Sequence, residues 1–183
     1  FDPVDKFVWA RGRFSARLNG GDAFTPGGYL TDYWTDESIK VIEANKHQPF
    51  FLYLAHWGVH TPLQATKADY DAVGDLKPHR LRVYAAMVRA LDRSVRRIEE
   101  KLAAEGLAEN TLIVFSSDNG GAGYIGLPEV NAPFRGWKIT FFEGGIRAPI
   151  FMKWPAKLKP GTKVQQPVAH IDLMPTMAAA AGA

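Results

Sequence analysis

The sequence predicts an α/β fold, arranged as a layered α/β/α sandwich around a largely parallel sheet. Helix-like and strand-like patterns alternate along the 183 residues, which is typical of folds with helices on both faces of a sheet. Two of the three expected strands have no polar face, and strands of that kind are buried on both sides in parallel sheets. No repeat or linker interrupts the pattern, so we expect a single domain over residues 1–183.

The first part of the chain predicts a loop-rich lead-in, one helix and one strand. Residues 1–30 are rich in glycine, proline and aromatic residues, which predicts irregular structure. A helix capped by Asp32 or Thr35 is expected to run to about Asn45. Its inner face would be formed by Trp34, Ile39 and Ile42. Residues 50–54 then form an unbroken apolar run that predicts a buried strand.

The strongest helical pattern lies between Tyr84 and Leu102. Apolar residues recur there at spacings of four and three, which forms one continuous stripe on a helix. The stripe consists of Tyr84, Val88, Leu91, Val95, Ile98 and Leu102. Gly106 followed by Leu107 has the sequence of a left-handed C-cap with its hydrophobic contact.

The remaining residues predict two more strands and a final helix. The β-branched and apolar residues 111–115 predict the second strand, and residues 148–153 predict the third. A glycine-rich loop over residues 120–136 lies between them. The final helix is expected over residues 172–181, with Pro175 in its first turn, where proline is tolerated.

The composition is that of a globular domain and excludes several functional classes. Apolar residues make up 46% of the chain and charged residues 22%. No apolar run approaches the roughly 20 residues of a membrane-spanning helix, so no membrane span is expected. The net charge is +3, but the basic residues are dispersed, which favours a solvated helix face over a nucleic-acid site. The absence of cysteine excludes disulfides, thiolate metal sites and a cysteine nucleophile from these residues.

Polar side chains follow the expected strands and occupy the loop before the last one. In open parallel sheets, ligands bind beyond the carboxyl ends of the strands. We therefore expect the side chains in these loops to meet at one edge of the sheet. The set comprises His56, His60, Asp118, Asn119, Arg135 and Lys138.

Asp118 and Asn119 offer an anionic and a neutral oxygen, which suits Ca²⁺, with Mg²⁺ as the alternative, better than zinc. Two ligands are too few for a calcium shell, so others must come from outside this chain. Taken alone, an Asp-Asn-Gly triplet after a strand is also a turn signal, and His60 and Lys138 could each be ordinary surface side chains. Together they would form a pocket for an anionic, tetrahedral group.

Several short motifs follow one another in order between residues 29 and 183. They include Pro49-Phe50-Phe51-Leu52-Tyr53-Leu54, His60-Thr61-Pro62, Ser117-Asp118-Asn119-Gly120-Gly121, Arg135-Gly136, Lys138, Glu143-Gly144-Gly145-Ile146-Arg147 and His170-Ile171-Asp172-Leu173. In this order the chain resembles the type I, formylglycine-dependent sulfatases of the alkaline-phosphatase-like superfamily. The resemblance implies that the chain forms part of that fold.

The resemblance also implies a chemistry. In such enzymes a formylglycine hydrate derived from cysteine attacks the sulfur of a sulfate ester, the alcohol leaves, and the sulfated enzyme then releases sulfate. By position, Asp118 and Asn119 would bind the calcium ion. His60 would contact the sulfate and the leaving-group oxygen, and Lys138 would hold the sulfate and its ester oxygen. The substrate would be a small-molecule or glycan sulfate ester.

The chain departs from the family pattern at three points. The Cys-x-Pro-x-Arg nucleophile motif and the other calcium ligands are missing, and in the family they lie N-terminal to the matched region, so truncation explains their absence. Trp137 flanks Lys138 where glycine is common, which makes it a candidate for the substrate mouth, with simple packing as the alternative. His56 is a candidate for an extra substrate contact, and Arg135 is a further one.

We therefore expect part of an arylsulfatase-like sulfuric ester hydrolase. The chain opens without an initiator methionine, and both of its ends suggest a longer polypeptide. The segment alone would be inactive and would bind calcium weakly. Two alternatives stay open: a phosphonate monoester or phosphodiester hydrolase of the same superfamily, and a non-catalytic module that binds sulfated ligands. The substrate, the oligomeric state and the compartment are left open, although periplasmic, secreted and lysosome-like locations are common in the family.

Overall fold

The structure, a computed structural model, describes residues 15–183. The predicted lead-in is therefore described only from residue 15 onward. Residues 15–29 form no helix and contain one isolated bridge, between Ala16 and Phe24. This confirms the prediction of irregular structure for that part of the lead-in.

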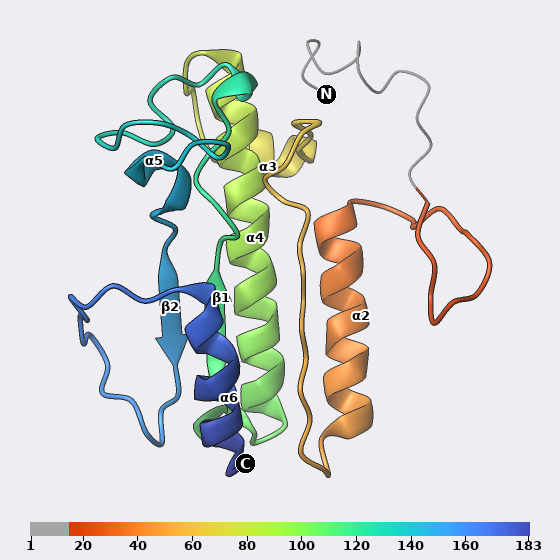
Figure 1. Cartoon of the computed structure of the whole chain (residues 1–183). Coiled ribbons are helices and arrows are strands. Elements are labelled where there is room, and N and C mark those ends of the chain that lie inside the picture. Colours follow the sequence, from red (N-terminus) through yellow and green to blue (C-terminus); the bar gives the residue numbers. More distant parts are fainter. Residues whose placement is uncertain (1–14) are drawn as a thin grey trace.

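Two long helices lie side by side, and a strand pair with a C-terminal helix lies on the far side of the longer one (Figure 1). The helices are α2 (Leu30–Asn45), α3 (Lys67–Ala72), α4 (His79–Ala104), α5 (Glu143–Ile146) and α6 (Leu173–Ala181). The strands are β1 (Ile113–Ser116) and β2 (Ile150–Lys153), and 3-10 turns occur at Ala108–Asn110, Gly123–Ile125 and His170–Asp172. Over residues 15–183, no helix has both the length and the apolar character that crossing a bilayer requires.

Helix α4 is present as predicted, but its buried residues share only Leu102 with the predicted stripe. The buried residues are Val83, Ala86, Met87, Ala90, Ser94 and Leu102, whereas Val88 is 46% exposed. Three of the buried residues are small, which allows α2 to pack closely against α4. The apolar stripe therefore identified the helix correctly, but most of its members are only half-buried, and the most buried face lies one position away on smaller residues.

The C-terminus of α4 has the predicted cap. Gly106 adopts a left-handed conformation with φ of 71°, which costs glycine little because it has no Cβ. The Gly106 N–H donates to the Ala103 carbonyl at 3.0 Å, and the Leu107 N–H donates to the Leu102 carbonyl at 2.8 Å. These two bonds make a Schellman motif and satisfy carbonyl groups at the helix end.

Arg93 of α4 joins three helices through one guanidinium group. It donates to both carboxylate oxygens of Asp32 in α2, at 3.0 to 3.1 Å, and to the carboxylate of Asp69 in α3. Asp69 is buried, and Arg89 lies 3.4 Å from the same carboxylate. Burial alone would raise the pKa of Asp69, but the hydrogen bonds and charges of Arg93, Thr66 and Arg89 outweigh it and hold the pKa below its ordinary value.

The predicted parallel sheet is not what the described residues form. β1 and β2 pair antiparallel, with Ile113 opposite Lys153 and Ser116 opposite Ile150. The apolar pattern identified both strands correctly, but a buried pattern does not specify the direction of the neighbouring strand. The class is α/β, with a two-stranded antiparallel sheet over residues 15–183.

The strand expected at residues 50–54 is not hydrogen-bonded into a sheet. The segment runs as an extended stretch between α2 and α4 (Figure 1). Side chains alternate along it, with Phe51 72% and Tyr53 80% exposed and Leu52 half-buried. A strand needs a partner for its backbone groups, and residues 15–183 supply none here.

A hydrophobic cluster anchors the loop that follows β1. It consists of Leu63, Val83, Met87, Ile125 and Leu127, all nearly inaccessible to solvent. Two members come from the 122–127 loop, so that part of the long β1–β2 connection is fixed to α4.

Candidate functional site

The antiparallel register brings two loops to one end of the strand pair. β1 ends at Ser116, which lies opposite Ile150 at the start of β2. The residues that directly follow β1 therefore lie beside the residues that precede β2. The expected meeting of Asp118–Asn119 with Lys138 occurs, although antiparallel rather than parallel strands produce it.

Backbone hydrogen bonds join the two loops. The Gly120 N–H donates to the Gly145 carbonyl at 2.9 Å, and the Lys138 N–H donates to the Gly121 carbonyl at 3.2 Å. A Cβ atom at Gly120 would lie 1.8 Å from the carbonyl oxygen of Gly144, so no other residue fits at this contact. The glycine pairs 120–121 and 144–145 thus permit the close approach that shapes the site.

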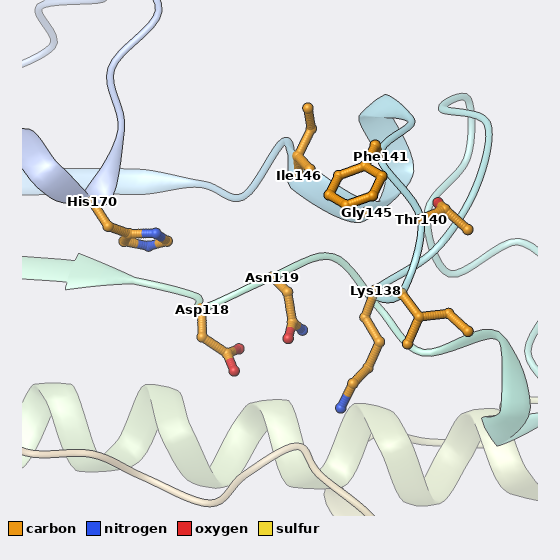
Figure 2. Close-up of a pocket in the computed structure, with 9 residues that line it drawn as sticks. Asp118, Asn119, Lys138, Thr140, Phe141, Gly145, Ile146 and His170 are labelled. Carbon is orange, nitrogen blue, oxygen red and sulfur yellow. The ribbon is translucent and has the colours of Figure 1, made fainter.

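An open pocket of about 400 Å³ lies between these loops. It is lined by Asp118, Asn119, Lys138, Ile139, Thr140, Phe141, Gly145, Ile146 and His170. In Figure 2, the side chains of Asp118, Asn119 and Lys138 extend to the same side of the loops, and Phe141 and Ile146 lie on the other side. The polar side combines a carboxylate, an amide and an ammonium group.

Asp118 and Asn119 present oxygen atoms that are not used elsewhere in the described part of the chain. The Asp118 carboxylate has no hydrogen bond or ion pair within residues 15–183. The Asn119 Nδ2 donates to the Gly120 carbonyl at 2.9 Å, which leaves the amide oxygen available. A carboxylate and an amide oxygen fit a hard cation such as Ca²⁺. Within residues 15–183, no group of three or more acidic, histidine or cysteine side chains could complete a metal site.

His60 and Lys138 meet although they are 78 residues apart in the sequence. The Lys138 Nζ lies 3.4 Å from the His60 Nε2. The His60 Nδ1 lies 2.8 Å from the Thr61 carbonyl oxygen, and because a carbonyl only accepts, Nδ1 carries the proton. The opposite ring nitrogen, Nε2, therefore faces the Lys138 ammonium group.

His56 is not brought to the pocket. Its Nε2 lies 2.9 Å from the Oγ of buried Ser94 in α4, and burial lowers the pKa of His56. Thr35 Oγ1 lies 2.6 Å from both the Thr31 carbonyl and Ser94 Oγ. A hydroxyl has one hydrogen and a carbonyl only accepts, so His56 donates to Ser94, Ser94 to Thr35, and Thr35 to Thr31.

Arg135 and Trp137 lie near the pocket without lining it. The Arg135 guanidinium stacks 3.9 Å from the centre of the Phe142 ring, a cation–π contact. Trp137 is half-buried and packs edge-on against Tyr124, with ring centres 6.0 Å apart. Both residues closely precede Lys138 in the chain, at positions 135 and 137.

Three residues of this region were not identified from the sequence. His170 lines the pocket and donates from Nε2 to the Ser117 carbonyl at 3.0 Å, although the sequence drew attention to it only as part of the His170-Ile171-Asp172-Leu173 motif. Tyr124 accepts a hydrogen bond from Lys138. Asn131 forms hydrogen bonds with Gly121 in one loop and Gly136 in the other. Lone Tyr and Asn residues in a glycine-rich loop carry no recognisable sequence signal, since only their three-dimensional position gives them a role.

Known proteins with similar sequences and structures share one family name. The sequence profile of the Sulfatase family matches residues 2–183. A protein from Formosa agariphila described as a sulfatase is 38% identical over 170 residues, which cover 85% of this chain and 30% of that protein. Human N-acetylgalactosamine-6-sulfatase is 37% identical over 173 residues, which cover 92% of this chain and 31% of that protein.

A solved structure extends the likeness to the fold. The crystal structure of Ps i-CgsB in complex with k-i-k-neocarrahexaose matches with a TM-score of 0.84 at 38% identity, over 90% of this chain and 36% of that chain. This chain spans about 30% of the length of the curated relatives given above. A profile match over nearly the whole chain, agreeing relatives and a shared fold establish that the chain belongs to the sulfatase family.

Proposed function

We propose that the full-length protein hydrolyses sulfate esters to an alcohol and sulfate, and that this chain supplies the anion-binding and cation-binding part of the active site. The observation that carries the proposal is the meeting of His60 and Lys138, 3.4 Å apart, beside the Asp118–Asn119 pair. Positive charge next to an oxygen-ligand pair suits a tetrahedral anion held together with a cation.

Lys138 and His60 are proposed to act on the sulfate ester directly. The ammonium group would bind a sulfate oxygen and lie against the ester oxygen, where negative charge develops as the alcohol leaves. His60, with its proton on Nδ1 and its Nε2 facing Lys138, would hold the ammonium group in place and contact the same oxygen atoms. Losing a group of this kind typically costs about 10²- to 10⁴-fold in rate.

Asp118 and Asn119 are proposed as calcium ligands, with Mg²⁺ as the alternative ion. A bound cation would offset the charge of the sulfate oxygens. Because calcium takes six to eight oxygen ligands, the other ligands would come from the rest of the protein. The nucleophile, a formylglycine by analogy with the family, would also come from there, since none of the 183 residues is cysteine.

The isolated chain is therefore proposed to be inactive and to bind calcium weakly. Calorimetric titration of the isolated chain should detect no binding at micromolar Ca²⁺, because only two ligands are present. The same preparation should not hydrolyse an aryl sulfate. Micromolar calcium binding, or turnover by a pure preparation, would contradict this division of the active site.

The complete catalytic domain is proposed to be the layered α/β/α sandwich with a largely parallel sheet, to which this chain contributes one continuous part. Residues 50–54 and β1 run in the same direction (Figure 1). Phe51 and Tyr53 are largely exposed, and Phe141 is 95% exposed, so apolar surface is left for other parts of the domain to cover. Hydrogen exchange on the full-length protein should find the amides of residues 51–54 protected.

The substrate is proposed to be a small-molecule or glycan sulfate ester. The glycan in the Ps i-CgsB complex supports the glycan class. Trp137 and Arg135 are proposed to face the alcohol portion, because both lie in the loop that carries Lys138. Relatives described as sulfatases favour a sulfate ester over a phosphate or phosphonate ester, and an enzyme over a binding module.

Turnover of matched esters by the full-length protein tests the proposal. An aryl sulfate and the corresponding aryl phosphate should be compared under the same conditions, with the sulfate ester preferred. K138A should lower kcat/KM for the sulfate ester by about 10²- to 10⁴-fold. K163A is the matched control, because Lys163 is exposed and does not line the pocket.

Two results would contradict the proposal. A preference for the phosphate ester would mean that the protein is a phosphate ester hydrolase rather than a sulfate ester hydrolase. Equal activity of K138A and the unchanged protein would mean that the lysine loop is not part of the active site.

A further inference from the structure

The Lys138 ammonium group has a second partner besides His60. Its Nζ donates to the Tyr124 hydroxyl oxygen at 3.2 Å and lies 5.6 Å from the centre of the Tyr124 ring. An ammonium group has three N–H bonds and no acceptor. With one directed at His60 and one at Tyr124, a single N–H remains for a bound anion.

Tyr124 lies on a turn whose backbone is anchored to α4. It is the middle residue of the Gly123–Ile125 turn, and the adjacent Ile125 is buried in the hydrophobic cluster on α4. Arg80 of α4 donates to the Ile125 carbonyl at 2.6 Å. The backbone of the Tyr124 turn is therefore anchored on both its apolar and its polar side.

Trp137 fixes the ring of Tyr124 from the lysine loop. The two rings pack at an interplanar angle of 86°, with centres 6.0 Å apart. A Cβ atom at Gly123 would lie 3.0 Å from the Trp137 ring, so glycine permits this close approach. Trp137 thus packs against the turn that carries Tyr124. In the chain, Trp137 directly precedes Lys138.

We infer that Tyr124 is a positioning residue for Lys138: its hydroxyl oxygen fixes the ammonium group so that the free N–H is directed at the sulfate ester. This inference rests on the function proposed above. A lysine side chain is flexible, and ordering it costs conformational entropy. The Tyr124 hydroxyl oxygen, on its anchored turn, orders the ammonium group before substrate binds. The ammonium group is therefore already in position for the reaction.

A double-mutant cycle in the full-length protein tests this inference. Y124F keeps the ring and its packing on Trp137 and removes only the hydroxyl, so it should lower kcat by about tenfold with little change in KM. Y124F in the K138A background should cost less than about twofold further, because the partner is already absent. Y33F is the matched control, since Tyr33 also packs edge-on against a tryptophan, with centres 5.1 Å apart, but lies on α2.

The outcomes distinguish the positioning role of Tyr124 from the proposed function. An impaired K138A together with a fully active Y124F would overturn the positioning role alone. The same loss on Y124F in both backgrounds would also overturn it, because the hydroxyl would then act without Lys138. A fully active K138A would overturn the proposed function and the positioning role together. Thermal unfolding of Y124F should match that of the unchanged protein, which excludes misfolding as the cause of lost activity.

Discussion

Asn131 clamps Gly121 on both of its backbone groups. The Asn131 Oδ1 accepts from the Gly121 N–H at 2.7 Å, and its Nδ2 donates to the Gly121 carbonyl at 2.9 Å. The same Nδ2 donates to the Gly136 carbonyl at 3.2 Å. One side chain therefore joins the loop that carries Asp118–Asn119 to the loop that carries Lys138.

N131A should loosen the two loops and lower activity. It leaves the Gly121 N–H without its partner, which typically costs about 1–3 kcal/mol when the group is shielded from water. Hydrogen exchange at the Gly121 amide of the full-length protein should become faster. N45A is the control, because Asn45 also donates from Nδ2 to a backbone carbonyl but lies at the end of α2. An unchanged exchange rate at Gly121 in N131A would contradict the clamp.

G120A should prevent the site from forming. The added methyl group would lie 1.8 Å from the Gly144 carbonyl oxygen, so one of the two backbones must move and the Gly120–Gly145 hydrogen bond is lost. We expect a loss of at least about 1–3 kcal/mol in stability and loss of activity. Thermal unfolding compared with G27A measures this, because a Cβ at Gly27 meets nothing within 4 Å. If G120A and G27A unfold at the same temperature, the backbones of Gly120 and Gly144 do not approach as closely as described.

R93A should destabilise the protein far more than R96A. Removing Arg93 leaves the buried Asp69 carboxylate with only the Thr66 hydroxyl and the more distant Arg89, and breaking a buried pair costs about 3 kcal/mol or more. Arg96 pairs with Asp92 on the exposed surface, where such pairs contribute about 0–1 kcal/mol. Urea unfolding of both variants measures the difference, and similar losses would contradict the three-helix role of Arg93.

The same carboxylate predicts a pH dependence. The pKa of Asp69 is lowered in the folded state, so its stabilising effect is complete above the ordinary value of 3.8. It is lost as the pH falls through the lowered folded-state pKa. R93A should therefore unfold in acid at a higher pH than the unchanged protein, and circular dichroism during an acid titration would measure this. Coincident acid transitions would mean that Arg93 does not lower this pKa.

His56 should affect stability rather than substrate binding. Burial lowers its pKa below 6.5, so the unfolded chain takes up this proton at higher pH than the folded protein does. The stabilising effect is complete above about pH 6.5 and is lost as the pH falls through the folded-state pKa. The decrease of the unfolding temperature between pH 7 and pH 5.5 should be smaller in H56Q, with KM unchanged. A raised KM in H56Q would instead support a substrate contact.

The sequence predicted what depends on local pattern. Apolar periodicity identified α4, and the Gly106–Leu107 pair identified its C-terminus, because both signals come from neighbouring residues. The direction of β2 and the inner face of α4 depend on what packs against them, which periodicity does not contain. Small residues such as Ala90 carry little hydrophobic signal, although Ala90 is completely buried on α4.

The same contrast between sequence signals and tertiary contacts applies to the candidate site. Asp118, Asn119, His60 and Lys138 could be selected because they occur in motifs of fixed order, and the structure brings them together. His56 was selected because it departs from the family pattern in the His60 loop, but its side chain packs against Ser94 instead. Single residues such as Tyr124 and Asn131 act through contacts 14 and 10 residues away in the sequence, which only the folded chain shows.

The joint action of His60 and Lys138 is tested most directly by kcat/KM of the full-length protein for an aryl sulfate, measured in H60A, K138A and the double variant. Two groups that act on one bound anion are strongly non-additive. The double variant should therefore be little worse than the more impaired single variant. Losses that multiply would mean that the two side chains act at separate places, and the account of a single anion site would be wrong.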